Sequence, residues 1–503
     1  MMDMTPFMRI ALINPPFLFP SREELVYSQA IGLRTLSSLL KREGHEVVFI
    51  DALLRGFREV TPYADGFRVG LTQSEIGDLI PEDVELVGMS VPFSQLAPIA
   101  HDLAEMVKES RPGALIGMGG VYPSTQPELA VCSAADFFVL GEGEIPLQQI
   151  ANTNSMDGIP GVYKTSDENL TGFSRAQLVD DLDSLPWPDT EIPYIERYFD
   201  ISPRNWQQPT ASIVTSRGCP FSCEFCSVHP VCGHRWRRRS PENVLGEIED
   251  LVGRFGVVSL EFEDDNFTVQ CERANSILEG VIKMQEDGVG LDWSTPNGIR
   301  IDTLDEDFIR LAKKSRCREI VLALEHGSPT MLRIMNKRLA LDDARQVIEW
   351  CVRHEIPKVT LFIITGYPGE TNEIFQESQR YLQSISKLGD NIRVWVNIAQ
   401  PYPGTDLLAR CRAEGYIDDP DFENFLVRRD LMSTTHCVPM TTSDFDAKEV
   451  LRRKQEIELL FNPPAEPSNG FQFMTTVKKH IPQPIKNRLK QVKRTFADLS
   501  RRI

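Results

Sequence analysis

The chain has 503 residues, of which 41% are hydrophobic and 25% charged, and its formal net charge is −18. This composition is typical of a globular protein and excludes extensive disorder, and the length predicts about two to four domains. The sequence contains no run of about 18 uncharged apolar residues, so we expect no membrane-spanning helix. The N-terminal segment lacks the pattern of a signal peptide, so we expect a cytoplasmic protein. The overall acidity argues against a general nucleic-acid binder.

Residues 1–152 are predicted to form an α/β domain with a doubly wound, Rossmann-like parallel sheet. Short apolar runs typical of strands alternate with helical spacing at residues 28–43 and between residues 91 and 114. The strand-like runs are residues 8–14, 45–52, 85–91, 114–118 and 137–140.

The segments that follow these runs are candidates for ligand binding, because such sheets bind ligands at the carboxyl ends of their strands. Glycine there lets the backbone approach a ligand closely, although the same glycines could serve only to shape tight turns. The candidate residues are Ser90, Gly119, Gly120, Tyr122, Gly141, Glu142 and Gly143.

The remainder of the chain is predicted to form three further regions. Residues 153–208 contain a small hairpin, expected at residues 161–169, and an acidic, proline-rich linker. Residues 209–430 alternate strands and helices again, and six β/α units predict a partial, TIM-like (β/α)6 barrel with its site at the C-terminal strand ends. Residues 431–503 are expected to form a helical C-terminal region. The strand-like runs of the barrel are residues 211–216, 258–263, 291–297, 319–324, 358–364 and 392–398.

Three of the ten cysteines lie close together, directly after a predicted strand. Cys219, Cys223 and Cys226 are spaced C-x3-C-x2-C, and three thiolates on one short loop can hold an iron–sulfur cluster. Zinc is the competing interpretation, since His229, Cys232 or His234 could supply a fourth ligand. A third interpretation is that the three cysteines lie close together by chance. The other seven cysteines are expected to be small buried apolar residues.

This motif, with Phe225 just before its last cysteine, resembles the radical S-adenosylmethionine (SAM) superfamily. The resemblance implies that the three cysteines hold a [4Fe–4S] cluster whose fourth iron binds the amino and carboxylate groups of SAM. Reductive cleavage of SAM would then give a 5′-deoxyadenosyl radical that abstracts hydrogen from an unreactive carbon. It also implies a one-electron donor such as flavodoxin or ferredoxin.

Further segments at predicted strand ends agree with this resemblance and supply candidate SAM-binding residues. Glu263 and Asp264 resemble the acidic segment that meets the SAM amino group, although such acidic turns are usually solvated loops. Arg300 is a candidate partner of the SAM carboxylate, or else a surface arginine. The resemblance places Glu325 near the ribose and methionine part of SAM, and Gly366 and Gly369 beside its adenine.

The predicted sheet ahead of the cysteine motif is similar to the cobalamin-binding domain of one radical SAM group, which includes methyltransferases and the anaerobic magnesium-protoporphyrin ester cyclase. The family's Asp-x-His-x-x-Gly loop is absent, so cobalamin is expected to lack a histidine ligand from this domain, unless the domain binds none. The function implied first is methylation of an unactivated carbon of a small-molecule or lipid-like substrate. A radical cyclisation or rearrangement is the alternative, as is a radical SAM enzyme whose first domain binds no cobalamin.

The C-terminal tail, residues 471–503, reverses the charge of the chain. It carries nine Lys or Arg against one Asp, a charge of +8, which leaves −26 on the rest. Its apolar residues follow at steps of three and four, which indicates a basic amphipathic helix. Such a helix can lie on an anionic membrane surface, or it can dock against the acidic body of the same chain.

Overall fold

The computed structural model describes residues 7–19, 29–63, 66–131, 133–167, 172–201, 207–417 and 438–461. One compact unit comprises Met1–Phe461, and the fold below is that of its described residues. The basic tail lies outside the described residues, so its helix stays a prediction. Among the helices that are described, none is long and apolar enough to cross a membrane.

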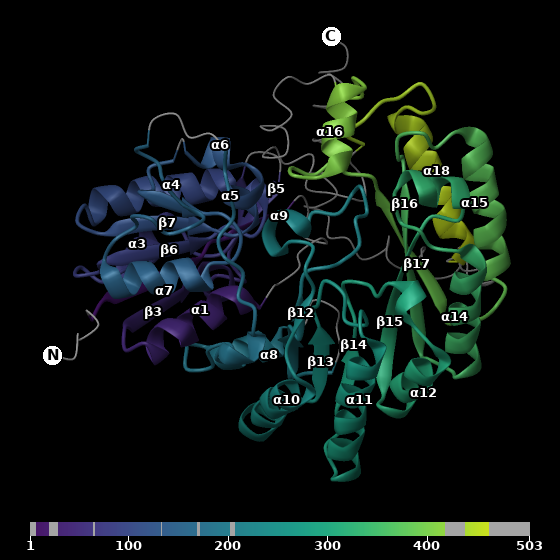
Figure 1. The fold of residues 1–503 in the computed structure, drawn as a ribbon, viewed down its shortest axis with the longest axis horizontal. Coiled ribbons are helices and arrows are strands. Elements are labelled where there is room, and N and C mark those ends of the chain that lie inside the picture. The colour runs from purple at the N-terminus through teal and green to yellow at the C-terminus, as the bar shows by residue number, and fades with distance from the viewer. Residues whose placement is uncertain are drawn as a thin grey trace, which may run out of the picture. The chain divides into compact units, whose positions relative to one another are not determined.

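The first sheet confirms the predicted doubly wound architecture. Its strand order is β3-β1-β6-β7-β8-β9, and the pairs from β3 to β8 are all parallel. Figure 1 shows helices on both sides of it: α1 (Ile31–Arg42) packs beside α7 (Glu144–Thr153), and α3 (Gln73–Leu79) beside α4 (Ala97–Ser110). The strands are β1 (Arg9–Asn14), β3 (Glu46–Asp51), β6 (Leu86–Ser90), β7 (Leu115–Gly119), β8 (Phe137–Val139) and β9 (Val162–Lys164).

Strand β9 differs from its predicted place in a small separate hairpin. It pairs antiparallel with β8, so it extends the first sheet at its edge. Tyr163 stacks on Phe138 there, with ring centroids 5.7 Å apart, and this contact with the sheet favours pairing with β8. Residues 168–171, where the rest of the hairpin was expected, lie outside the described part of the chain.

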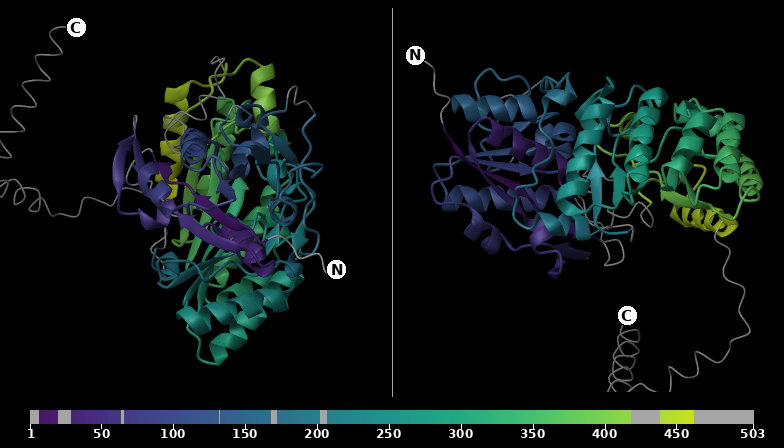
Figure 2. Two further views of the ribbon diagram at one scale, coloured as in Figure 1. Left: turned by 90° about the vertical axis from the view of Figure 1, so that its left-hand side faces the viewer. Right: turned by 90° about the horizontal axis from the view of Figure 1, so that it is seen from below.

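The second sheet confirms the six predicted β/α units. Its order is β10-β13-β14-β15-β16-β17, every pair is parallel, and β10 and β17 form its two edges, so the barrel is partial. The views of Figure 2 show the helices of this domain around its strands. The strands are β10 (Thr210–Ile213), β13 (Ser259–Phe262), β14 (Asp292–Ser294), β15 (Cys317–Glu325), β16 (Lys358–Thr365) and β17 (Ile392–Ile398).

One helix of this domain shows how its sequence fixes both of its ends. The Ser240 side chain caps α10 (Pro241–Phe255), and Gly256 in a left-handed conformation ends it. The last described helix, α18 (Ala447–Phe461), packs against β17 and covers that edge strand. The other described helices of this domain are the short α9 (His229–Cys232), α11 (Cys271–Glu286), α12 (Glu306–Lys314), α13 (Pro329–Ile334), α14 (Leu341–Arg353), α15 (Asn372–Ile385) and α16 (Asp406–Ala413).

Two small sheets were not predicted because their strands have two to four residues. One consists of β2 (Phe17–Phe19), β4 (Val60–Tyr63) and β5 (Gly66–Val69). The other pairs β11 (Ser216–Arg217) with β12 (Arg237–Arg238) and brackets the cysteine motif.

The acidic linker is fixed to the first domain by one buried residue. Asp189 is 3% exposed, and its carboxylate accepts a hydrogen bond from Ser37 and pairs with Lys41 at 2.7 Å. Its backbone carbonyl accepts a bond from Arg34, also on α1. The linker is therefore an ordered connection on this side, although its composition alone suggested only a spacer.

Candidate functional site

The cysteine triplet lies on one loop, residues 218–226, which we call the cluster loop. All three thiols are free and half-buried. Burial raises the pKa of Cys219 and Cys223, and it raises the pKa of Cys226 to about 12. Because a metal binds the thiolate, loading this loop must release protons. The donor set fits an iron–sulfur cluster, whose thiolates bind different iron atoms and do not converge on one ion.

The residues proposed for a zinc site do not gather around this loop as ligands. His229 stacks on His234 with ring centroids 3.8 Å apart, and its Nε2 lies 3.2 Å from the carbonyl oxygen of Cys219. In the described part of the chain, no three His, Cys, Asp or Glu side chains come together as ligands of a single metal ion. These histidines therefore flank the loop.

Two buried cations lie beside Cys223. Arg300 is 6% exposed, stacks 3.7 Å from the ring centre of Phe221, and places Nη1 3.9 Å from the sulfur of Cys223. Lys337 is 4% exposed and its Nζ lies 3.0 Å from Glu325 Oε1. Glu325 has a φ of +67° at the end of β15, where the register shifts. Arg300 and Glu325 are thus brought together, and Lys337 joins them from 12 residues further along the chain.

The acidic segment after β13 divides into three different environments. Asp264 is buried and accepts hydrogen bonds from Thr215 and from Ser216 Oγ, so it fixes the start of the cluster loop. Asp265 accepts a bond from the backbone nitrogen of Gly218 at 2.8 Å. Burial raises the pKa of both carboxyls. Glu263 lines a cavity, so of the two predicted SAM contacts it is the one placed toward open space.

The loop after β16, residues 366–370, is held by a buried network; we call it the adenine-side loop after its expected role. Glu370 is fully buried and accepts a bond from the backbone nitrogen of Gly366 at 2.7 Å. His326 Nδ1 accepts from the backbone of Ser328, so its Nε2 carries the proton and donates to Glu370. Arg453 on α18 donates to the Glu370 carbonyl at 2.7 Å. Gly366 and Gly369 have φ of +71° and +88°, which glycine adopts without strain.

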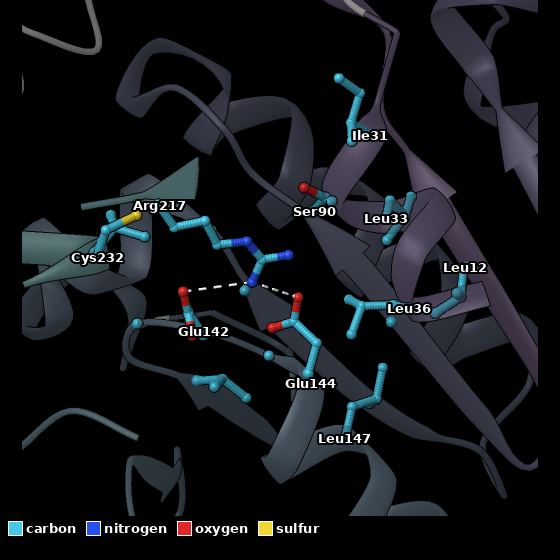
Figure 3. A pocket seen from close by; sticks show the side chains of 18 of the residues that line it. Leu12, Ile31, Leu33, Leu36, Ser90, Glu142, Glu144, Leu147, Arg217 and Cys232 are labelled. Carbon is cyan, nitrogen blue, oxygen red and sulfur yellow. Dashed lines mark ion pairs between the residues drawn. The ribbon is translucent and has the colours of Figure 1, made fainter. Parts of the chain in front are cut away.

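A cavity of about 330 Å³ lies between the carboxyl ends of the first sheet and the start of the second domain. One wall is apolar and includes Leu33, Leu36 and Leu147 (Figure 3). The opposite wall is polar and comes from the second domain, next to the cluster loop. Its lining residues from that domain are Val214, Ser216, Arg217, Val231, Cys232, Glu263 and Asp265.

Ion pairs across this cavity join the two domains. Arg217 Nη1 lies 2.7 Å from Glu144 Oε1 and 3.4 Å from Glu142 Oε1, and Figure 3 shows it between the two carboxylates. Arg237, its neighbour on β12, donates two bonds of 2.7 Å to the Glu142 carboxylate. Burial favours the neutral form of Glu142, but these arginines outweigh it and lower its pKa. The network therefore attaches the start of the cluster loop to the end of β8.

The strand-end residues predicted in the first domain fall into two groups. Tyr122 does not line the cavity: it is 1% exposed and its hydroxyl lies 3.0 Å from His101. A side chain at Gly119 would meet open space, whereas one at Gly120 would come within 2.8 Å of the Val91 carbonyl. The predicted residues that do line the cavity are Ser90, Gly119, Gly120, Gly141, Glu142 and Gly143.

Protein-family models match the two regions of the chain that form this site. The Radical SAM superfamily model matches residues 213–382, and the B12 binding domain model matches residues 26–151. The chain is a B12-binding radical SAM protein. The B12 binding match ends just before the linker, and the Radical SAM match contains the cluster loop, so the cavity lies where the two matched regions meet.

Similar proteins align with most of this B12-binding radical SAM protein. An uncharacterized methyltransferase of Pyrococcus horikoshii is 27% identical, over 80% of this chain and 82% of that protein. The cytidylyl-2-hydroxyethylphosphonate methyltransferase of Streptomyces wedmorensis is 26% identical, over 82% and 83%. The anaerobic magnesium-protoporphyrin IX monomethyl ester cyclase of Synechocystis is 25% identical, over 71% and 68%. The structure of the radical SAM methyltransferase TsrM from Kitasatospora setae superposes with a TM-score of 0.65 at 18% identity, over 81% and 75%, and shares the fold.

Sequence reasoning missed several residues of this site. Arg217 and Asp265 carried a local signal, since each adjoins a motif that was recognised. Arg237 and Lys337 carried none, because each lies in a segment without a motif of its own, although their partners Glu142 and Glu325 were both candidates. The cavity residue Cys232 was considered as a zinc ligand or as a small buried residue, and not as part of a cavity.

Proposed function

We propose that this radical SAM enzyme is a cobalamin-dependent methyltransferase that methylates an unactivated carbon of a small-molecule or lipid-like substrate. The observation that carries the proposal is the cavity whose walls come from the B12-binding region and from the residues next to the cluster loop. A methyl donor held on one wall lies close to the site where a substrate radical would be generated. The methyltransferases among the similar proteins support the same assignment.

The cluster with SAM and the cobalamin have distinct sites in this proposal. When bound, the [4Fe–4S] cluster and SAM supply a hydrogen-abstracting radical, and cobalamin supplies the methyl group. Cys219, Cys223 and Cys226 hold the cluster. In this proposal the Arg300 guanidinium, whose Nη1 lies 3.9 Å from the sulfur of Cys223, would meet the SAM carboxylate. Glu263 remains the proposed contact of the SAM amino group.

The cavity suits the edge of a large, amide-rich ring such as cobalamin. Gly119 leaves open space at the end of β7, so the backbone there can lie close to a bulky group. The leucine wall can bury apolar ring surface, while Ser90 and Asp265 offer hydrogen-bonding groups. The residues that line the described cavity include no histidine.

The domain limits and partners complete the proposal. We assign residues 1–152 to the cobalamin domain, 153–208 to the linking region, 209–430 to the radical SAM core and 431–503 to the C-terminal region. A flavodoxin or ferredoxin would supply the electron. Contact of residues 471–503 with an anionic membrane is proposed from their charge and the spacing of their apolar residues, since they lie outside the described residues.

Anaerobic turnover with SAM labelled in its methyl group tests the reaction type. The reconstituted enzyme is incubated with a small-molecule and lipid extract, and products are analysed by mass spectrometry. Labelled methyl in a product supports methyl transfer. A product that forms without the label, while SAM is cleaved, would instead support a radical cyclisation, which the similarity to the cyclase makes the second candidate.

A further inference from the structure

We propose that Glu224 and Tyr367 form a positioning link that fixes the cluster loop relative to the adenine-side loop. This inference rests on the proposed function, because it concerns how two ends of one SAM molecule are kept in register. The cluster would hold the amino-acid end of SAM, and the adenine-side loop would hold its base. Neither residue was a candidate from the sequence.

The link between the side chains is direct and partly buried. The Tyr367 hydroxyl donates a hydrogen bond to Glu224 Oε2 at 2.6 Å, although the two residues are 143 positions apart. Tyr367 has no exposed surface, and its ring meets the edge of Phe225 with centroids 6.4 Å apart and planes at 85°. Arg410 on α16 places Nη1 3.3 Å from the same carboxylate oxygen. One carboxylate between two cluster cysteines is thus held by two different elements.

The backbone of Glu224 is held from two further directions. Its nitrogen donates to the carbonyl of Met335, just after α13, at 3.0 Å. Its carbonyl accepts from the nitrogen of Leu407, near the start of α16, at 2.9 Å. All the partners follow the cluster loop in sequence, and Tyr367 is the one that lies on the adenine-side loop. Glu224 therefore joins the middle of the cysteine motif to the second half of the radical SAM domain.

The hydrogen bond between Tyr367 and Glu224 is expected to be strong and permanently formed. A hydrogen bond to an ionised carboxylate is shorter and stronger than a bond between neutral groups, and 2.6 Å is typical of one. Burial and the neighbouring Glu224 raise the pKa of Tyr367, so the phenol stays protonated and keeps donating at physiological pH. Without this bond the two loops would keep their own internal contacts and the bridge through Arg410, which reaches both Glu224 and the Pro368 carbonyl, but they would lose their direct side-chain hydrogen bond.

The test compares SAM binding with cluster content in variants of the anaerobically reconstituted enzyme. Tyr367→Phe removes the hydroxyl and keeps the ring, and Glu224→Gln removes the charge and keeps the shape. Tyr381→Phe is the matched control: the Tyr381 hydroxyl also donates a partly buried hydrogen bond, to the Leu341 carbonyl at 2.9 Å, but it lies on the outer helix α15. Iron and sulfide analysis measures the cluster, and equilibrium dialysis with radiolabelled SAM measures affinity.

We expect Tyr367→Phe to keep its iron and bind SAM about tenfold more weakly, the loss expected for one charge-assisted hydrogen bond. Glu224→Gln should weaken binding in the same direction, and the double variant should be little worse than Tyr367→Phe, because both changes break one link. Tyr381→Phe should bind SAM as the wild type does.

Two results would overturn the inference. One is wild-type SAM affinity in both Tyr367→Phe and Glu224→Gln. The other is a loss of iron in proportion to the loss of SAM binding, which would make the contact a requirement for cluster assembly. If the wild-type protein itself held neither iron nor SAM, the proposed function would fail, and this outcome is separate from the behaviour of the variants. Should Tyr367→Phe not fold, Glu224→Gln alone decides.

Discussion

The ion pair between Arg217 and Glu144 makes a quantitative prediction about how firmly the two domains are joined. Arg217→Met removes a guanidinium 2.7 Å from a carboxylate that is 4% exposed. Glu142 would keep its two bonds from Arg237, but Glu144 would lose the arginine that faces it. Removing one partner of a buried pair costs about 3–5 kcal/mol. Because the Arg217 side chain is 17% exposed, we expect the free energy of unfolding to fall by about 3 kcal/mol, the lower end of this range.

Urea unfolding of the cofactor-free protein, followed by circular dichroism, measures this loss. Arg235→Met is the matched control, since Arg235 pairs with Asp180 at the same 2.7 Å but both side chains are 64% exposed. An exposed pair contributes about 0–1 kcal/mol, so this variant should unfold almost as the wild type does. Adding Glu144→Gln to Arg217→Met removes the stranded charge and should recover part of the stability.

The reasoning is refuted by either of two results. Arg217→Met could unfold within about 0.5 kcal/mol of the Arg235→Met control, which would mean that the pair contributes no more than an exposed one. Alternatively, Glu144→Gln could give no recovery in the double variant. The first result would show that the guanidinium is not what holds the cluster loop to β8.

Three further predictions concern the cavity, pH and the tail. Gly119→Leu should fill the open space at the end of β7 and weaken hydroxocobalamin binding by about tenfold or more, as an order of magnitude for a blocked site. Gly113→Leu, the control on an exposed turn with equally open space, should leave this affinity unchanged. Equal affinities of the two variants in a spectroscopic titration would contradict the assigned site. The lowered pKa of Glu142 means that its carboxylate stabilises the fold above the unfolded-state pKa of about 4.3, and that this contribution is lost as the pH falls below that value. Urea midpoints measured between about pH 3 and 6 should show this loss of stability. Arg237→Met, which removes the main partner of Glu142, should make the midpoint depend less on pH. Deleting residues 471–503 should reduce co-sedimentation with anionic liposomes but not with neutral ones, and unchanged sedimentation would exclude membrane contact through this segment.

Most of the fold could be predicted from the sequence because each buried parallel strand is a short, nearly continuous apolar run. The runs at residues 8–14 and 358–364 fall almost on β1 and β16 for this reason. The place of β9 could not be predicted, since three residues can pair with either neighbour and the choice depends on aromatic contacts with β8.

The site was predictable where its chemistry lies on consecutive residues. The cysteine motif specifies its own cluster loop, and the glycines at the end of β7 mark an open strand end. The contacts that hold these parts together join distant residues, such as Tyr367 with Glu224 or Arg453 with Glu370. A single charged or aromatic residue gives no sign of its partner, so these pairs come only from the folded chain.

The central claim is that one chain holds a [4Fe–4S] cluster and cobalamin at sites that meet at the cavity. Metal analysis of the anaerobically reconstituted protein, with hydroxocobalamin supplied, tests it most directly. The account predicts about four iron atoms and about one cobalt per chain, with Cys223→Ala losing the iron but keeping the cobalt. Iron without cobalt in the wild type, or cobalt lost together with iron in Cys223→Ala, would contradict it.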